Sequence, residues 1–283
     1  MRIFLTGATG YIGGAVCDAL LRAGHTVVGL VRSQEQAVRL AAKGAAAHPG
    51  DLRDPGDLAA GARQADAVIH TALLPAADAG DVDRRAVEAM HGPLLIYTSG
   101  CWVLGNTGDR VADEDTPLAP TPLVAWRPAV EQLVLARGRG IVLRPAMVYG
   151  RGGGLLQSFV QSARKHGAAR VIGDGQNRWT FVHVDDLADL YVRLLDAPPG
   201  TLLFAAHGPA LRVREVAAAA SGAAGAAGRV EFIPLADARL SMGPLADALA
   251  LDQQISGERA RRSLAWRPIA PSVIDDLATG AQA

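Results

Sequence analysis

The chain has 283 residues, a hydrophobic fraction of 49%, and 28 basic against 28 acidic side chains. Its length suits one large α/β domain or two closely joined lobes, and its apolar content excludes a disordered chain. The formal net charge of zero removes the electrostatic argument for a nucleic-acid partner.

The sequence carries no sign of export or membrane insertion. The apolar opening at 1–5 is interrupted at once by Thr6 and Gly7, so it is too short for a signal peptide. No run of about 18 apolar residues is present, and two cysteines cannot form a disulfide framework. We expect a cytoplasmic protein that acts on a small molecule, without a nucleic-acid or membrane partner. A homodimer through the long helices of the core is as compatible with the sequence as a monomer.

Residues 1–150 alternate short apolar runs with helical stretches, a pattern typical of a parallel sheet with crossover helices. Strands are expected at 2–6, 26–31, 45–48, 67–70, 94–98 and 141–144, and helices at 11–23, 34–43, 79–91 and 123–137. Asp54 is expected to cap a further helix that has Pro55 in its first turn. The segment 106–122 is expected to be a polar loop, with Asp113, Glu114 and Asp115 in a solvated turn.

The pattern changes after Gly150. Helices are expected at 155–166 and 185–195, short strands within 171–182, a strand at 202–205 that rejoins the main sheet, and mostly helix beyond 212 with one strand at 229–233. The predicted fold is an α/β, Rossmann-type doubly wound parallel sheet formed by 1–150 and 174–208. Residues 151–173 and 209–283 are expected to form a smaller, mostly helical substrate-binding lobe, with ligands in the cleft beside the sheet.

Three glycines follow the first expected strand and open the first expected helix. Gly7 permits a tight turn, Gly10 lets the backbone approach a pyrophosphate, and Gly13 lets the helix pack closely on the sheet. The N-terminus of that helix offers unpaired N–H groups and a partial positive charge to phosphates. The segment therefore predicts a dinucleotide site. Its contact residues are expected to include Thr9, Tyr11 and Ile12.

The spacing G-x-x-G-x-x-G, with Thr6 before it, resembles the extended short-chain dehydrogenase/reductase family, which includes sugar-nucleotide epimerases, dehydratases and dihydroflavonol-reductase-like enzymes. Five later segments resemble motifs of the same family in the same order, and the resemblance runs from Arg2 to about Ala206. These segments are 50–52, 68–72, 97–99, 143–150 and 181–186. The resemblance implies further cofactor contacts at Asp51, Leu52, Thr71, Ala72, Thr98, Pro145 and Val148.

The residue that follows the second strand indicates which dinucleotide binds. NAD users tend to carry an Asp or Glu there for the ribose 2′-OH, whereas an Arg accommodates the 2′-phosphate of NADP. Here Arg32 and Ser33 follow the strand, and no carboxylate appears before Glu35. Arg32 can pair with phosphate in a bidentate way, and Ser33 can add a hydrogen bond. The sequence therefore favours NADP(H) over NAD(H), with a solvated loop arginine as the alternative.

The catalytic set that the family usually carries is missing. It consists of a Ser or Thr after the fifth strand and a Tyr-x-x-x-Lys motif on the next helix; the Tyr is the general acid/base, and the Lys lowers its pKa and holds the nicotinamide ribose. By the resemblance, Gly100, Leu123 and Arg127 occupy the Ser, Tyr and Lys positions. Leucine cannot transfer a proton, so the chain looks like an atypical member whose mechanism differs.

Three residues remain as candidates for the chemistry. Arg127 can hold the ribose or orient an oxyanion, and its alternative is a helix residue in a salt bridge. Ser99, together with Thr98, can hydrogen-bond a substrate carbonyl, or both simply end a strand. Tyr149 is the candidate proton donor, or else a packed aromatic ring whose hydroxyl binds backbone. His70 is interpreted as structural.

Other chemistries lack their residues. No two histidines stand at metal-ligand spacing, no Gly-x-Ser-x-Gly elbow is present, and no Lys follows the glycine loop as in a P-loop. The predicted function is an NADP(H)-dependent oxidoreductase, a reductase or dehydrogenase, of a small carbonyl or alcohol. One alternative is a sugar-nucleotide epimerase or dehydratase, against which the missing Tyr argues. The other is a non-catalytic NADP(H)-binding sensor, which the loss of the usual set favours.

Overall fold

The structure, a computed structural model, describes residues 1–279, which form two compact units. The first unit comprises 1–99, 126–144 and 187–203, and the second comprises 100–125, 145–186 and the chain from 204 onward. Each unit is described by itself below. The assignment of a cofactor-binding domain and a substrate-binding lobe to particular residue ranges stays a prediction.

The first unit is built on a seven-stranded sheet with the order β11-β7-β5-β4-β1-β2-β3. The pairs from β3 through β7 are all parallel. The strands are β1 (Arg2–Thr6), β2 (Thr26–Val31), β3 (Ala46–Pro49), β4 (Ala67–His70), β5 (Leu94–Thr98), β7 (Gly140–Pro145) and β11 (Leu202–Ala205). Because β2 and β4 flank β1 on opposite sides, the winding reverses at β1, which is where open α/β sheets bind their ligands. The predicted doubly wound sheet is confirmed.

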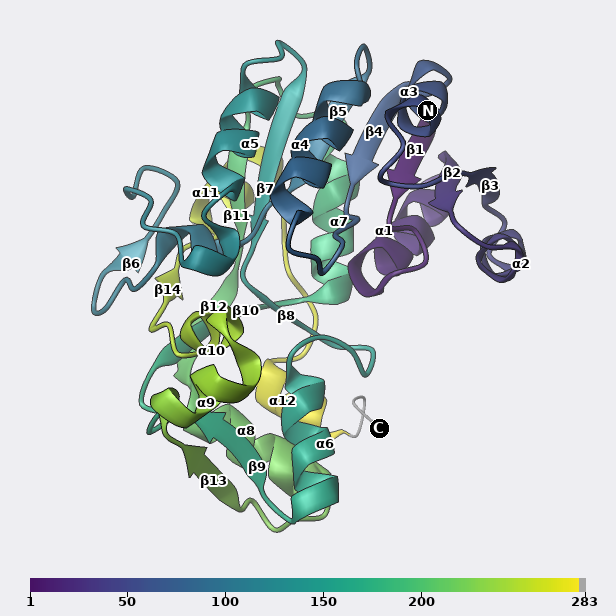
Figure 1. The fold of residues 1–283 in the computed structure, drawn as a ribbon. Coiled ribbons are helices and arrows are strands. Elements are labelled where there is room, and N and C mark those ends of the chain that lie inside the picture. Colours follow the sequence, from purple (N-terminus) through teal and green to yellow (C-terminus); the bar gives the residue numbers. More distant parts are fainter. Residues whose placement is uncertain (280–283) are drawn as a thin grey trace. The chain divides into compact units, whose positions relative to one another are not determined.

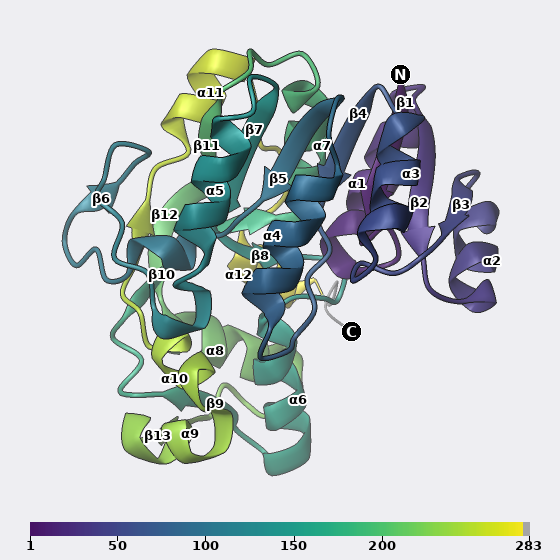
Figure 2. The ribbon, with the colours of Figure 1, turned by 45° about the horizontal axis from the view of Figure 1, so that its top comes forward.

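Helices cover both faces of this sheet. Figures 1 and 2 show α3, α4 and α5 side by side on one face, with α1 and α7 on the other. The helices are α1 (Tyr11–Arg22), α2 (Gln34–Ala42), α3 (Pro55–Arg63), α4 (Ala79–Ala89), α5 (Arg127–Leu135) and α7 (Val184–Leu194). The core under the first face contains Phe4, Val68 and Leu95 from the strands, packed against buried side chains such as Leu58 and Val130 from the helices. The strands buried on both faces read as continuous apolar runs for this reason.

A local sequence signal marks the start of α3, and a proline sets the start of α5. The carboxylate of Asp54 accepts hydrogen bonds from the N–H groups of Gly56 and Asp57, so it caps α3 as predicted. The single helix predicted over 123–137 is wrong: a 3₁₀ turn, η2 (Pro122–Val124), precedes α5, which begins only at Arg127. The reason is Pro128, which lacks an N–H and is tolerated only in the first turn of a helix.

The second unit contains three small sheets. β12 (His207–Arg212), β10 (Arg178–His183) and β8 (Met147–Tyr149) form one, β13 (Val230–Ile233) and β9 (Ala169–Ile172) another, and β14 (Gln254–Ile255) and β6 (Val111–Ala112) the third. Its helices are η1 (Cys101–Leu104), α6 (Leu156–His166), α8 (Val213–Ala223), α9 (Leu235–Met242), α10 (Pro244–Leu249), α11 (Glu258–Leu264) and α12 (Val273–Ala278). Within residues 1–279, no helix has the length and apolarity needed to cross a membrane.

One acidic residue of the 106–122 loop is not solvated. The side chain of Glu114 is 2% exposed; it accepts a 2.8 Å hydrogen bond from the N–H of Phe204 and lies 3.1 Å from Arg259. Burial raises the pKa of Glu114. The predicted solvated turn is therefore wrong at this position, because Glu114 ties the loop to Phe204 and Arg259, which also belong to the second unit.

Candidate functional site

The parallel sheet of the first unit brings the predicted cofactor residues to one edge. The glycine loop follows β1, Arg32 follows β2, Asp51 follows β3 by two residues, Thr71 follows β4, and Ser99 follows β5. Because neighbouring parallel strands end at the same side, all of these positions lie at the carboxyl edge. Residues from five separate strand ends are thus assembled along one line.

The loop after β1 is shaped so that glycine is required. Gly7 has a φ of +75°, and a Cβ added there would lie 2.7 Å from Oγ1 of Thr71. A Cβ on Gly13 would collide with the carbonyl oxygen of Gly7, and one on Gly10 would lie 3.2 Å from that same oxygen. The hydroxyl of Thr71 donates a 2.8 Å hydrogen bond to the carbonyl of Thr6, which fixes the start of the loop to the end of β4. The tight, closely packed turn predicted from the sequence is present.

The N-terminus of α1 is left open for an anion. Its N-cap is Gly10, which has no side chain to accept a hydrogen bond from the first-turn N–H groups, and the first turn holds no acidic residue. Such N–H groups and the helix dipole attract phosphate. Thr9, Tyr11 and Ile12 are half-buried beside Gly10. These residues fit the pyrophosphate of a dinucleotide.

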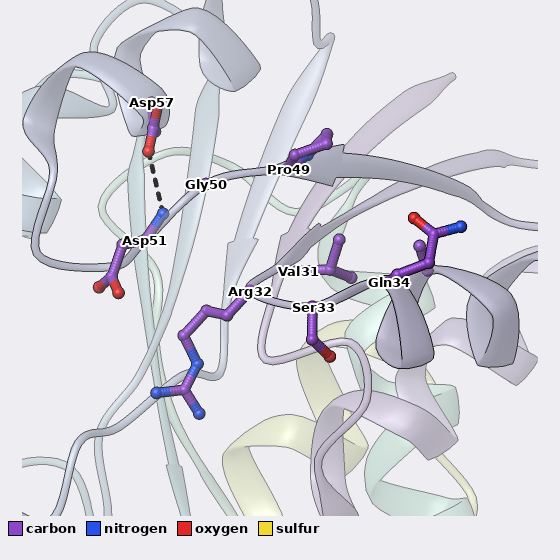
Figure 3. A pocket seen from close by; sticks show the side chains of 9 residues that line it. Val31, Arg32, Ser33, Gln34, Pro49, Gly50, Asp51 and Asp57 are labelled. Atoms are coloured by element: carbon purple, nitrogen blue, oxygen red, sulfur yellow. Dashed lines mark hydrogen bonds between the residues drawn. The ribbon is translucent and has the colours of Figure 1, made fainter.

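A pocket of about 390 Å³ lies beyond the ends of β2 and β3. Its lining residues are Val31, Arg32, Ser33, Gln34, Ala37, Pro49, Gly50, Asp51 and Asp57. Figure 3 shows the side chains of Arg32, Ser33 and Asp51 extending on the same side of the backbone. The structure therefore brings together Arg32 and Ser33, which the sequence assigned to the 2′-phosphate, and Asp51, which the resemblance assigned to the cofactor.

Arg32 is the cation of this pocket. Its side chain is exposed, and within residues 1–279 it makes no hydrogen bond or ion pair; only its N–H is bonded, to the side chain of Gln36 at 2.8 Å. The hydroxyl of Ser33 caps α2 by accepting a 3.3 Å hydrogen bond from the N–H of Gln36. A helix N-terminus and a guanidinium thus face the same pocket, which is an arrangement suited to a phosphate.

Carboxylates line the far side of the pocket. Oδ2 of Asp57 accepts a 3.0 Å hydrogen bond from the N–H of Asp51, as the dashed line in Figure 3 shows. Oδ1 of Asp51 accepts a 2.8 Å hydrogen bond from the N–H of Arg53. Leu52 packs its side chain into the core, so only its backbone is left for a cofactor. Both carboxylates therefore accept from backbone N–H groups of the segment that follows β3, and neither pairs with Arg32 within residues 1–279.

The end of β5 carries the candidate chemistry of the first unit. Nη1 of Arg127 donates a 2.8 Å hydrogen bond to the carbonyl of Thr98, whose hydroxyl lies 2.5 Å from that of Tyr191. Ser99 is 7% exposed, and its hydroxyl has no hydrogen-bond partner within residues 1–279. A buried hydroxyl without a partner is costly unless a ligand satisfies it.

Arg127 is a buried cation without a direct counter-ion. It is 9% exposed, and its guanidinium lies 4.7 Å from the centre of the Trp126 ring. In the part of the chain that the structure describes, no carboxylate lies within ion-pair distance of it. The salt-bridge alternative is therefore not realised in this region. By contrast, Arg144 forms a direct buried pair with Glu131 through bonds of 3.0 and 2.5 Å.

Three predicted site residues belong to the second unit. Pro145 ends β7, Val148 is half-buried on β8, and Tyr149 is 4% exposed. The hydroxyl of Tyr149 donates a 2.6 Å hydrogen bond to the carbonyl of Pro271, and burial raises the pKa of Tyr149. This is the packed-aromatic geometry that the sequence left open. The roles of these three residues toward the cofactor stay predictions.

Two residues near the site were missed from the sequence. Asp83 and Tyr97 are both buried, and the Tyr97 hydroxyl lies 3.3 Å from Nη1 of Arg127. Asp83 stands among the buried apolar residues Val82, Ala86 and Val87 of α4. A carboxylate on the apolar face of a helix was the available signal.

Comparison with known proteins finds relatives in sequence and in fold. Residues 3–202 match the family described as NAD dependent epimerase/dehydratase. An uncharacterized protein of Schizosaccharomyces pombe is 32% identical over 99% of both chains. A 2-alkyl-3-oxoalkanoate reductase of Stenotrophomonas maltophilia is 27% identical over 76% of this chain and 73% of its own. The crystal structure of UDP-glucuronic acid 4-epimerase from Bacillus cereus, in complex with UDP-glucuronic acid and NAD, shares the fold with a TM-score of 0.81, 19% identity and coverage of 99% and 98%.

Proposed function

The chain belongs to the NAD dependent epimerase/dehydratase family, in line with its resemblance to the extended short-chain dehydrogenase/reductases, and we propose that it is an NADP(H)-dependent reductase of a small carbonyl compound. The single observation that carries the proposal is the pocket beyond β2. There the guanidinium of Arg32, which has no partner within residues 1–279, and the N-terminus of α2 stand where NAD-dependent proteins of this fold tend to place a carboxylate.

The choice of NADP(H) follows from the charge in that pocket. A 2′-phosphate carries close to two negative charges near neutral pH, and Arg32 is the nearest residue to the end of β2 that can pair with it. Glu35 is the first acid after the strand, but it is 81% exposed on its side chain and lies 3.9 Å from Arg39. The pocket therefore favours a phosphate over a bare ribose hydroxyl.

The reaction we propose uses the two candidates at the end of β5. When bound, the cofactor supplies a hydride. The free hydroxyl of Ser99 donates a hydrogen bond to the substrate carbonyl, and Arg127 stabilises the negative charge that develops on its oxygen and holds the nicotinamide ribose. Solvent water then protonates the alkoxide. The hydroxyl of Tyr149 is bonded to the carbonyl of Pro271, so we do not assign this proton to it.

The reductase name of the Stenotrophomonas maltophilia relative supports this choice within the family. An epimerase or dehydratase needs a base that removes a hydroxyl proton, and Leu123 stands where the family carries its Tyr. The same substitution supports one second candidate, an NADP(H)-binding sensor without turnover. Carbonyl reduction needs only a polarised carbonyl and a proton for the alkoxide after hydride transfer, so the missing base impairs it least.

A two-stage experiment tests the proposal. The purified protein is first titrated with NADPH and NADH by fluorescence and calorimetry, and we expect NADPH to bind at least tenfold more tightly. It is then incubated with NADPH and a panel of aldehydes, ketones and 3-oxo acids while NADPH consumption is followed. Binding without consumption by any member would favour the sensor. Absence of binding of either coenzyme at millimolar concentration would refute the dinucleotide site.

A further inference from the structure

A chain of buried polar side chains joins the glycine loop to Arg127. Oγ1 of Thr6 lies 2.6 Å from Nδ1 of His70, and Nε2 of His70 lies 3.0 Å from Oδ1 of Asp83. The Tyr97 hydroxyl donates a 2.5 Å hydrogen bond to Oδ2 of Asp83 and lies 3.3 Å from Nη1 of Arg127. All five residues belong to the first unit, and none is more than 9% exposed. We call these five side chains the relay.

The relay connects five elements, three strands of the sheet and two helices that cover it. Thr6 and His70 end the neighbouring strands β1 and β4, Tyr97 lies on β5, and Asp83 and Arg127 come from α4 and α5. Figure 2 shows α4 and α5 side by side on the same face of the sheet. Apolar core residues pack around Asp83 and Tyr97, so the polar atoms of these two side chains need partners inside the protein.

The direction of each hydrogen bond follows from the carboxylate of Asp83, which can only accept. Nε2–H of a neutral His70 therefore donates to Asp83, and the bare Nδ1 accepts from the hydroxyl of Thr6, which also accepts from the N–H of Ala72 at 3.4 Å. Burial raises the pKa of Tyr97, which keeps its hydroxyl protonated and donating to the other oxygen of Asp83. With a neutral His70, the relay holds one negative charge, on Asp83, and one positive charge, on Arg127.

The two buried arginines of the first unit differ in how their charge is balanced. Arg144 contacts Glu131 directly through Nε and Nη2. The carboxylate that balances Arg127 is Asp83, and the hydroxyl of Tyr97 lies between the two charged groups. Within residues 1–279, Nε and Nη2 of Arg127 make no hydrogen bond. A direct ion pair would use the N–H donors of the guanidinium on a carboxylate inside the protein. The indirect pair holds one edge of Arg127 against β5 and leaves the other donors for a ligand oxygen.

We propose that Asp83 and Tyr97 are positioning residues that hold Arg127 for the nicotinamide half of the cofactor, and that His70 couples this arrangement to the glycine loop through Thr6. This inference rests on the proposed dinucleotide site. It assigns a role to three buried polar residues that neither touch the cofactor pocket beyond β2 nor belong to the family's usual catalytic set. His70, interpreted from the sequence as structural, gains a role through its two partners.

The test compares two ligands that share one end. NADPH reaches both halves of the site, whereas adenosine 2′,5′-bisphosphate carries only the adenosine half with its 2′-phosphate. We expect Tyr97→Phe and Asp83→Asn each to weaken NADPH binding about tenfold in calorimetry and to change the affinity for the bisphosphate less than twofold. General damage to the fold would weaken both ligands together. The fragment therefore reports folding, and the difference between the ligands reports positioning.

A double-mutant cycle decides whether Tyr97 acts through Arg127. In an Arg127→Met background, Tyr97→Phe is expected to cause no further loss of NADPH affinity, because the group it positions is gone. Tyr191→Phe is the matched control: it removes another fully buried tyrosine hydroxyl, one bonded to Thr98 instead of to the relay, and both affinities are expected to stay within twofold of the wild type.

Three outcomes overturn the inference. They are equal losses for NADPH and the bisphosphate, an additive loss in the Arg127→Met background, or unchanged NADPH binding in both relay variants. Should Tyr97→Phe fail to fold, Asp83→Asn carries the same comparison. A wild-type protein that binds neither ligand refutes the proposed function instead, so the two failures are told apart before any variant is made.

Discussion

Reversing the charge at Arg32 is the sharpest test of the cofactor assignment. Among residues 1–279, Arg32 is the only cation that lines the pocket beyond β2, and the change Arg32→Asp replaces it with a carboxylate where NAD-dependent proteins of this fold tend to have one. Because the side chain makes no hydrogen bond or ion pair within residues 1–279, its loss leaves no buried group unpartnered. The effect on stability should therefore stay within about 0.5 kcal/mol.

The expected magnitude follows from the exposure of the site. Two unit charges about 4 Å apart interact with about 1 kcal/mol in water and about 4 kcal/mol near a protein surface. Arg32 is exposed, so the lower end of this range applies, and charge reversal both removes an attraction and adds a repulsion. We expect NADPH binding to weaken by about 2–3 kcal/mol, roughly 30- to 150-fold. NADH binding should be unchanged or tighter, because Asp can accept from the ribose 2′-OH.

The assay is calorimetric titration of NADPH and NADH at two salt concentrations. Arg39→Asp serves as the control, since Arg39 is an exposed arginine on α2, the helix that follows Arg32, and does not line the pocket. The same change in net charge there should alter NADPH affinity less than threefold, and the Arg32 effect should shrink with added salt. Equal losses of NADPH and NADH affinity in Arg32→Asp would refute the assignment to NADP(H).

Three further changes test other parts of the structure. Gly13→Ala should weaken NADPH binding at least tenfold, because the added Cβ would meet the backbone of the glycine loop. Gly14→Ala, whose added Cβ would have its nearest neighbour 3.8 Å away, should leave NADPH affinity within twofold of the wild type, and calorimetry of both variants decides this. Glu131→Gln should lower the free energy of unfolding by about 3–5 kcal/mol in chemical denaturation, because it breaks a buried pair with Arg144. Glu88→Gln, which breaks an exposed pair, should lower it by less than about 1 kcal/mol, and similar losses in the two variants would contradict this. Tyr149→Phe should cost about 1 kcal/mol of stability for its bond to Pro271 and leave turnover within twofold; a tenfold slower turnover would instead establish Tyr149 as the proton donor.

Local signals were sufficient for the sheet and for the loop after β1. Continuous apolar runs mark strands that are buried on both faces, and Gly7 and Gly13 stand where a side chain would collide with neighbouring atoms. Arg32 was found for the same reason: it follows a strand directly, and the strand end fixes its place at the sheet edge. Each of these features depends on residues close together in the chain.

The late start of α5 and the burial of Glu114 show where structure prediction from the apolar pattern and local composition fails. The apolar pattern of 123–137 is compatible with one helix, but the restriction imposed by Pro128 divides it. Glu114 resembles its solvated neighbours in sequence, and its partners, Phe204 and Arg259, are far away along the chain. Composition carries no information about such distant partners.

The sequence by itself determined the class of fold and the position of the glycine loop. Only the tertiary structure decided that Arg127 has no direct counter-ion within residues 1–279 and that Asp83 lies one hydroxyl away from it. Strands and turns are set by interactions among near neighbours, which a sequence pattern records. The charge balance of a buried group is set by whichever side chains the packing of several elements brings within a few ångströms, and that information exists only in three dimensions.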